Sequence, residues 1–226
     1  LEEYSRPRVN GVNAISIREG DRVIGVCLTN GKDEIMLANR NGRAIRFDED
    51  RVRPMGRTAT GVRGITLDEG DDEVISMVCI NDAERESVMV VGENGYGKRS
   101  KPEDYRKTNR GGMGVKTMQI SEKTGRVVAL KAVTDDDDLM IINKSGITLR
   151  LPLDSVKVIG RDTQGVKLIE LARRGDAIAS VCRVPKAEEQ AEEPNEQPTE
   201  GAPATIESEA AAPIDENSDK PTENQE

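Results

Sequence analysis

The chain has 226 residues, with 33 lysines and arginines, 42 aspartates and glutamates, and no histidine. The lack of histidine excludes imidazole-dependent triads, histidine zinc sites and imidazole acid–base catalysis. No apolar run approaches the roughly 18 residues that a membrane-spanning helix needs, and no signal peptide opens the chain, so we expect no membrane partner.

Residues 1–185 are an array of similar units. The segment 6–30 matches only the second half of a unit, and full units follow at 33–81, 86–134 and 137–185. A Gly-Val pair marks the middle of each copy, and its glycines are spaced by 50, 53 and 51 residues: Gly11, Gly61, Gly114 and Gly165. Because several features recur in one register, we expect about 3.5 copies of one structural element.

Each full unit predicts four short strands. In the first full unit these are Ile35–Ala38, Arg43–Phe47, Val62–Leu67 and Val74–Ile80. Asn41-Gly42 joins the first two strands, and such a pair is the strongest short hairpin signal. No segment keeps a helical period. Four strands per unit of about 50 residues predict an all-β fold of propeller-like blades.

Three cysteines occupy one place in the last strand of three units: Cys27, Cys79 and Cys182. Ala132 fills this place in the remaining unit, which favours a small core position over a metal or redox site. Equivalent positions on successive blades should lie far apart. We therefore expect no shared metal ion and no disulfide, but three free thiols in an intracellular compartment.

The segment from residue 186 to 226 differs in composition. It carries 13 acidic and 2 basic residues and no aromatic residue. It cannot bury enough apolar surface to offset the entropy of ordering, so we predict a disordered acidic tail after one globular domain at 1–185. The tail could compete with a ligand for the basic surface of the domain, or it could be a solubilising spacer.

The residues show no catalytic constellation. Asp135–Asp138 could bind a cation, but we expect a solvated loop between blades. Gly111–Gly114 is rich in glycine, yet it precedes a strand, whereas a nucleotide-binding loop needs a helix and a Lys-Ser/Thr pair. Tyr4, Tyr96 and Tyr105 have no metal-binding carboxylate pattern around them. We therefore expect no catalytic residue and no metal ligand.

Basic residues gather between the second strand of each unit and the Gly-Val pair. Residues 43–63 hold 6 basic and 3 acidic residues, 96–116 hold 7 and 2, and 147–167 hold 4 and 2. Blades set side by side would join these segments into a basic band, although an ordinary solubilising surface is the alternative. Such a band suits the phosphates of duplex DNA, because counterion release drives binding without sequence preference. Few aromatic residues are available for stacking, which disfavours single strands.

The basic side chains that we expect to neutralise DNA phosphates share these three segments. They are Arg46, Arg57, Arg63, Lys98, Arg99, Lys107, Arg110, Lys116, Arg150, Arg161 and Lys167.

Three motifs closely resemble the C-terminal domain of bacterial DNA gyrase A. They are MGRTATGVRGI at 55–65, NGYGKR at 94–99 and VIGRDTQGV at 158–166. The resemblance covers residues 1–185 and extends to the acidic tail. It implies a β-pinwheel, a propeller-like ring usually of six blades that wraps DNA around its basic perimeter. The family's gyrase box, Gln-Arg-Arg-Gly-Gly-Lys-Gly, does not occur in the chain, and Arg110–Gly114 is similar to it only in part.

The resemblance further implies a bacterial cytoplasmic, chromosome-associated type II topoisomerase, in which gyrase B is the partner within an A2B2 heterotetramer. That enzyme uses ATP and Mg²⁺ to introduce negative supercoils. Its catalytic tyrosine and cofactor sites would lie elsewhere, so we expect this chain to be a non-catalytic DNA-wrapping module without a cofactor of its own. The alternatives are the C-terminal domain of the corresponding topoisomerase IV protein and a blade-type protein-interaction scaffold.

Overall fold

The computed structural model describes residues 2–6, 8–171 and 175–186. All of them belong to the first of the two compact regions into which the chain divides, Leu1–Ala187. The predicted tail lies outside these residues from 187 onward. The helical elements of the described part are single 3-10 turns, namely η1 (Glu2–Tyr4), η2 (Glu49–Arg51), η3 (Pro102–Asp104) and η4 (Leu153–Ser155). No helix in this part is long and apolar enough to cross a membrane.

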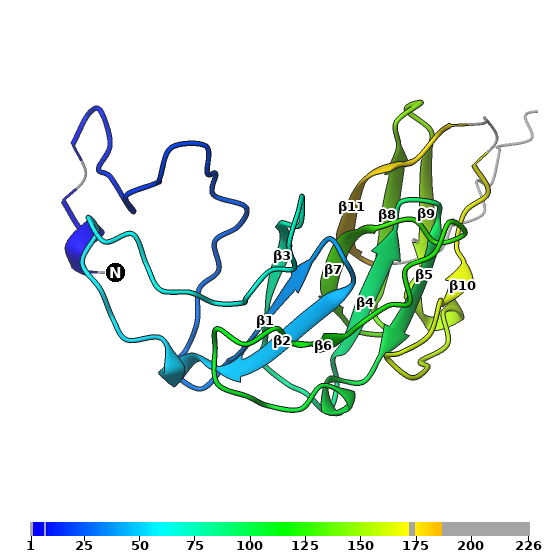
Figure 1. Ribbon diagram of the computed structural model, residues 1–226, viewed down its shortest axis with the longest axis horizontal. Coiled ribbons are helices and arrows are strands. Elements are labelled where there is room, and N and C mark those ends of the chain that lie inside the picture. Colours follow the sequence, from blue (N-terminus) through cyan, green and yellow to red (C-terminus); the bar gives the residue numbers. More distant parts are fainter. Residues whose placement is uncertain (1, 7, 172–174, 187–226) are drawn as a thin grey trace, which may run out of the picture. The chain divides into compact units, whose positions relative to one another are not determined.

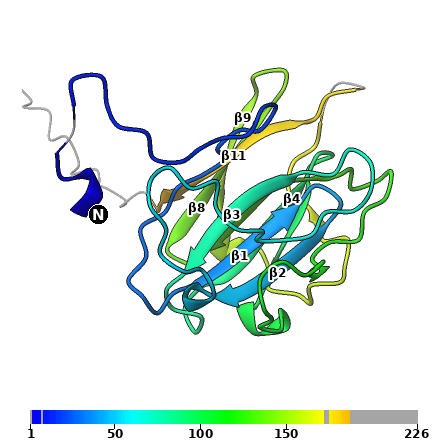
Figure 2. The ribbon, with the colours of Figure 1, turned by 60° about the vertical axis from the view of Figure 1, so that its left-hand side comes forward.

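The strands form three antiparallel sheets that stand side by side (Figures 1 and 2). Sheet A has the order β3-β1-β2-β6, from β1 (Glu34–Asn39), β2 (Arg43–Asp48), β3 (Val74–Ile80) and β6 (Val115–Lys116). Sheet B has the order β10-β5-β4-β7, from β4 (Ser87–Gly92), β5 (Tyr96–Ser100), β7 (Val127–Val133) and β10 (Val166–Lys167). Sheet C has the order β11-β8-β9, from β8 (Asp137–Asn143), β9 (Thr148–Pro152) and β11 (Ile178–Pro185). The prediction of an all-β fold of blades is confirmed.

Sheets A and B each take their last strand from the following repeat unit, which the repeat pattern did not predict. β6 belongs to the second full unit but pairs with β2 of the first, so that Val115 lies opposite Ala44. β10 of the third unit pairs with β5 of the second in the same way. The glycine before each of these strands has a positive φ, and a Cβ on Gly114 would collide with the carbonyl group of Ala44. The Gly-Val pair is therefore the point at which one unit abuts the previous blade.

The segment Val62–Leu67 forms no strand, so that part of the prediction is wrong. In the two later units, the strand at this position pairs with the second strand of the preceding blade. For Val62–Leu67 the preceding blade is that of the half unit, and residues 6–30 contain no counterpart of its first two strands. Residues 22–28 likewise form no strand. A Cβ on Gly61 would meet nothing within 4 Å, unlike one on Gly114. A hollow of about 900 Å³ lies between residues 15–25 and 60–74, where this blade is incomplete.

The blades pack through both faces of their sheets. Successive residues of a strand point to opposite faces, so Met36 of β1 joins the cluster shared by sheets A and B, with Val90 and Leu130 from sheet B. Ile35 faces the other way and packs with Phe47. A second cluster joins sheets B and C. Burial on both faces explains why the strands are richer in apolar residues than a half-exposed sheet requires.

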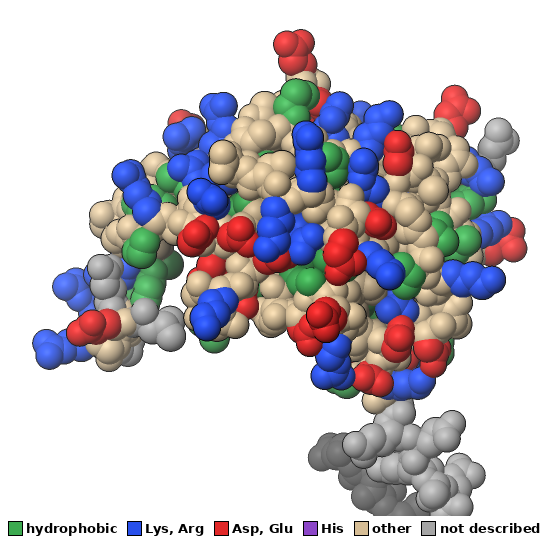
Figure 3. Space-filling model, turned by 90° about the horizontal axis from the view of Figure 1, so that it is seen from below, with side chains coloured by type: hydrophobic (Ala, Val, Ile, Leu, Met, Phe, Trp, Pro, Cys, Tyr) green, Lys and Arg blue, Asp and Glu red, His purple; other side chains and the backbone are tan. Residues whose placement is uncertain are grey.

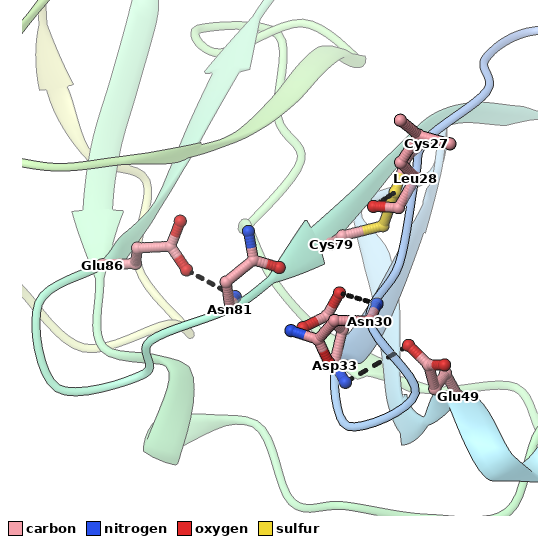
Figure 4. Close-up of a disulfide and its surroundings, with 8 residues drawn as sticks. All are labelled: Cys27, Leu28, Asn30, Asp33, Glu49, Cys79, Asn81 and Glu86. Carbon is pink, nitrogen blue, oxygen red and sulfur yellow. Dashed lines mark hydrogen bonds between the residues drawn. A yellow bond between two sulfur atoms is a disulfide. The ribbon is translucent and has the colours of Figure 1, made fainter.

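Cys27 and Cys79 form a disulfide, which corrects the prediction of three free thiols. Figure 4 shows the segment that carries Cys27 running beside β3, with Asn30 bonded to Asp33 close by. The prediction assumed that Cys27 and Cys79 lie in equivalent strands of two complete blades and are therefore far apart. Cys27 lies in no strand, so its segment can run beside β3 and bring the two sulfur atoms together. Cys182 is a free, exposed thiol.

Candidate nucleic-acid interface

Three loops join the second strand of a unit to its Gly-Val pair, and we call them the rim loops: 49–61, 102–114 and 153–165. Each begins with a single 3-10 turn. Isolated parallel bridges pair Arg46 with Lys107 and Arg99 with Val158. The second and third rim loops therefore run beside the second strand of the preceding blade and end at the sheet edge opposite β3 and β7.

The arginine near the middle of each second strand has a structural role. Arg99 is 3% exposed and donates to the hydroxyl of Ser87 (2.8 Å) and to the carbonyl oxygen of Leu153 (2.7 Å), which begins the next rim loop. Arg46 pairs with Glu34 and donates to the carbonyl oxygens of Pro102 and Tyr105. These side chains are buried, so we exclude Arg46 and Arg99 from the exposed interface.

Lys98 is also buried, beneath the third rim loop. Its ammonium group donates to the carbonyl oxygen of Gly160 (3.0 Å), to that of Arg161, and to the hydroxyl of Thr163 (3.1 Å). Burial lowers the pKa of Lys98 to about 8. Its carbonyl and hydroxyl partners belong to the loop, so Lys98 shapes the rim from inside and does not present a charge to a ligand.

A second set of arginines holds successive rim loops together. Arg110 donates to the carbonyl oxygens of Arg51 (2.9 Å) and Arg63 (3.1 Å), both from the preceding unit. Arg161 donates to the carbonyl oxygens at the equivalent positions, Asp104 (2.9 Å) and Lys116 (2.7 Å). Arg57, at the equivalent position of the first full unit, donates to the carbonyl oxygen of Asn13 (3.2 Å). Asn13 occupies in the half unit the position that Arg63 occupies in the first full unit. Carbonyl oxygens do not neutralise a guanidinium, so Arg110 and Arg161 fix the loops and keep their charge.

Besides the buried Arg46 and Arg99, three exposed cations of the predicted set are paired with carboxylates. The ammonium group of Lys107 lies 2.5 Å from Glu34 and 3.0 Å from Asp48, and the hydrogen bonds to these carboxylates raise the pKa of Lys107. Arg150 pairs with Asp138 at 2.6 Å. Lys167 pairs with Glu170 at 2.8 Å, which raises the pKa of Lys167. The partner carboxylate must be displaced or shared before such a cation can serve a phosphate.

Of the eleven predicted cations, Arg63 and Lys116 are exposed with no side-chain partner among the described residues. With Lys167 they form one row in repeat register. The sequence analysis did not include a second row of cations, because it selected nearby basic residues of the same loops, namely Arg57, Lys107 and Arg161. Its members are exposed and equally without a side-chain partner in the described part of the chain: Arg53, Arg106 and Lys157.

We call these six residues the two cation rows: Arg53, Arg106 and Lys157, and Arg63, Lys116 and Lys167. The shared register of 53 and 51 residues was the available signal for the missed row. Figure 3 shows one face of the molecule on which basic side chains gather in the upper half and mix with acidic ones below. The arrangement offers repeated points of positive charge, one pair for each blade.

The described residues offer no catalytic arrangement. Within them, no cluster of three or more metal-binding side chains occurs. Asp135 and Asp138 pair with Arg99 and Arg150, so the acidic run is engaged with arginines. Tyr105 is fully buried against Thr117, and burial raises the pKa of its hydroxyl, which is the opposite of what an activated nucleophile requires.

Comparisons with known proteins point to one family. A family model described as "DNA gyrase C-terminal domain, beta-propeller" matches residues 1–30, 33–81, 86–134 and 137–184. The DNA gyrase A protein of Staphylococcus aureus (strain MRSA252) is 46% identical over 196 residues, which cover 87% of this chain and 22% of that protein. The DNA gyrase A protein of Chlamydia pneumoniae is 42% identical over 182 residues, covering 80% of this chain and 22% of that protein. The chain thus spans about a fifth of the length of these relatives.

Two solved structures are similar in fold. The C-terminal domain of DNA topoisomerase IV superposes with a TM-score of 0.75 at 26% identity, covering 81% of this chain and 57% of that one. The DNA gyrase A C-terminal domain superposes with a TM-score of 0.69 at 28% identity, covering 77% and 58%. Both likenesses agree with the blade architecture.

Proposed function

Since this chain belongs to the family of DNA gyrase C-terminal domains, we propose that it binds duplex DNA without sequence preference and wraps it as part of a DNA gyrase A protein. The observation that carries the proposal is the pair of cation rows. They recur with the blades, they are exposed, and five of the six residues have no side-chain partner among the described residues. A charged surface that repeats with the blades can contact several phosphates of one duplex.

The energetics favour wrapping over a single contact. Bending 20–30 base pairs by 40–90° costs about 1–6 kcal/mol, so one basic residue cannot hold a bent duplex. Each neutralised phosphate instead releases counterions and contributes a slope of about −0.9 in log K against log salt. Six cations in register therefore supply a large, salt-dependent attraction. The carbonyl bonds of Arg110 and Arg161 fix the rim loops and the backbone of Arg63 and Lys116 beside them, which limits the entropy lost on binding.

The remaining parts of the proposal follow from the relatives. The whole protein would be a type II topoisomerase that works with gyrase B in an A2B2 assembly in the bacterial cytoplasm. ATP and Mg²⁺ would be bound outside this chain. The chain itself would contribute no catalytic residue: it would wrap a DNA segment and return it to the cleavage gate with positive crossing sense, and strand passage would then make the net change negative.

A topoisomerase IV role is the second candidate, because the C-terminal domain of that enzyme superposes with a TM-score of 0.75. Sequence identity of 42% and 46% to gyrase A proteins, over more than three quarters of this chain, favours gyrase. Either role requires a basic rim that binds duplex DNA.

Wrapping is tested with nicked circular DNA that is sealed by ligase in the presence of the chain and then freed of protein. We expect topoisomers shifted toward positive linking number, in proportion to the bound protein. The variant Arg53→Gln/Arg106→Gln/Lys157→Gln should lose most of the shift. A matched control with the same charge change at exposed lysines outside the rim loops, Lys32→Gln/Lys123→Gln/Lys144→Gln, should keep it. No shift at saturating wild-type protein would refute wrapping.

A further inference from the structure

A narrow cleft lies between the second rim loop and β2. It encloses about 260 Å³, with Ala44 and Ile45 on the strand side and Arg106, Thr108 and Gly112–Gly114 among the residues on the loop side. Arg106 belongs to a cation row and has no side-chain partner among the described residues. No acidic residue lines the cleft, so its electrostatic environment favours an anion.

Several polar groups of this loop have no partner in the described part of the chain. The backbone N–H groups of Gly112, Met113 and Gly114 donate no hydrogen bond, and the buried hydroxyl Oγ1 of Thr108 has none. The Thr108 hydroxyl is buried, and an unsatisfied buried polar group costs about 1–3 kcal/mol, which a ligand could recover. Gly111 and Gly114 have φ values of 85° and 72°, and successive N–H groups next to such residues form concave anion sites.

The third rim loop shows that this space is filled elsewhere by the protein itself. There the ammonium group of Lys98 bonds to Gly160 and Thr163. The residue equivalent to Lys98 in the first blade is Ile45, whose Cδ1 atom lies near Gly112 and offers no hydrogen bond. Lys98 therefore places a positive charge in the equivalent space of the third loop and satisfies oxygen atoms there, whereas the second loop has an apolar side chain at this position and keeps a cleft.

We propose that this cleft is a phosphate subsite that binds one phosphodiester of the wrapped duplex. The phosphate oxygens accept hydrogen bonds from the N–H groups of Gly112–Gly114 and from the Thr108 hydroxyl, with Arg106 at the border. The inference rests on the proposed function for the source of the phosphate. Backbone amides are uncharged, so this subsite adds affinity without counterion release and fixes the position of the duplex on the rim.

The subsite is tested by removing one N–H without changing charge. Met113 is replaced by its α-hydroxy acid, so that an ester oxygen takes the place of the nitrogen, and Glu69 receives the same change as a matched control. Duplex affinity is measured over a range of salt concentrations. We expect the Met113 ester to bind about tenfold more weakly at every salt concentration, with the wild-type slope, because a hydrogen bond to a charged group contributes about 1.5 kcal/mol. Thr108→Val should weaken binding with the same unchanged slope, and the Glu69 ester should bind as wild type.

The outcomes separate this inference from the proposed function. If wild-type protein binds, the row variant binds more weakly, and the Met113 ester equals wild type, only the subsite is refuted. If folded wild-type protein does not bind duplex, the proposed function fails.

Amide NMR of Gly112–Gly114 separates the possible sources of the phosphate. Shifts caused by duplex, with or without shifts caused by inorganic phosphate, support the subsite. Shifts caused by inorganic phosphate alone, or by neither, overturn it.

Discussion

Arg99 and Arg106 lie seven positions apart, and the structure assigns them opposite roles. Arg99 is buried and bonds to Ser87 and Leu153, whereas Arg106 is exposed with no side-chain partner among the described residues. Arg99→Met keeps most of the buried volume but removes both hydrogen bonds, so that the carbonyl group of Leu153 retains only the N–H group of Val156 as a partner. Hydrogen bonds to charged groups contribute about 1.5–3 kcal/mol each, so we expect a loss of about 3 kcal/mol in the free energy of unfolding.

The assay is urea denaturation together with DNA binding by the folded fraction. With a slope of about 2 kcal/mol per molar urea, a loss of about 3 kcal/mol lowers the midpoint by about 1.5 M. Arg99→Met should leave the salt slope of DNA binding unchanged. Arg106→Gln should change stability by less than about 0.5 kcal/mol but reduce the slope by about 0.9. The two roles are wrongly assigned if Arg99→Met costs less than about 1 kcal/mol, or if the two variants reduce the slope equally.

Three further predictions concern the interior and the loops. Burial lowers the pKa of Lys98 to about 8 from an unfolded value near 10.5, so the unfolded chain binds more protons between these values and stability should rise with pH across this window. Urea midpoints at several pH values should show this rise in wild type and not in Lys98→Met. Arg110→Lys keeps the charge but replaces the two separate donors of the guanidinium, Nε and Nη1, with a single ammonium nitrogen, so titrations should give weaker DNA binding with a nearly unchanged salt slope; an unchanged affinity would contradict the loop-fixing role. Reduction of the Cys27–Cys79 disulfide, which spans 52 residues, should lower stability by up to about 4 kcal/mol, and Cys27→Ser should remove the effect of reductant on the urea midpoint.

The strands of each hairpin could be predicted from the sequence because their signals are local. Asn41-Gly42 fixes the turn, and β3 has the predicted bounds, Val74–Ile80. The exchange of β6 between blades could not be predicted, because a repeat read alone assigns every strand to its own unit and two paired residues leave no periodic pattern. Val62–Leu67 failed for a related reason: strand formation needs a partner, and the incomplete half unit supplies none.

The candidate interface was predicted by region more accurately than by residue. Counting charge located the rim loops but could not distinguish exposed arginines from buried ones. Arg46 lies on a buried strand with Glu34 twelve positions earlier, and Arg150 follows Asp138 at the same distance, which indicates internal pairs. Comparing the positions of carboxylates and arginines between units could therefore have identified Arg46 as internally paired and left Arg53 as the exposed cation.

The central claim is that the two cation rows bind DNA phosphates, and the salt dependence of duplex affinity tests it most directly. Wild type is compared with a variant in which all six row residues are glutamine, and with a control that has six exposed cations outside the rows changed. We predict that the slope of log K against log salt, which is negative, becomes shallower by about 5 in the row variant and by less than about 1 in the control. Equal slopes for wild type and the row variant, with both proteins folded, would contradict the claim.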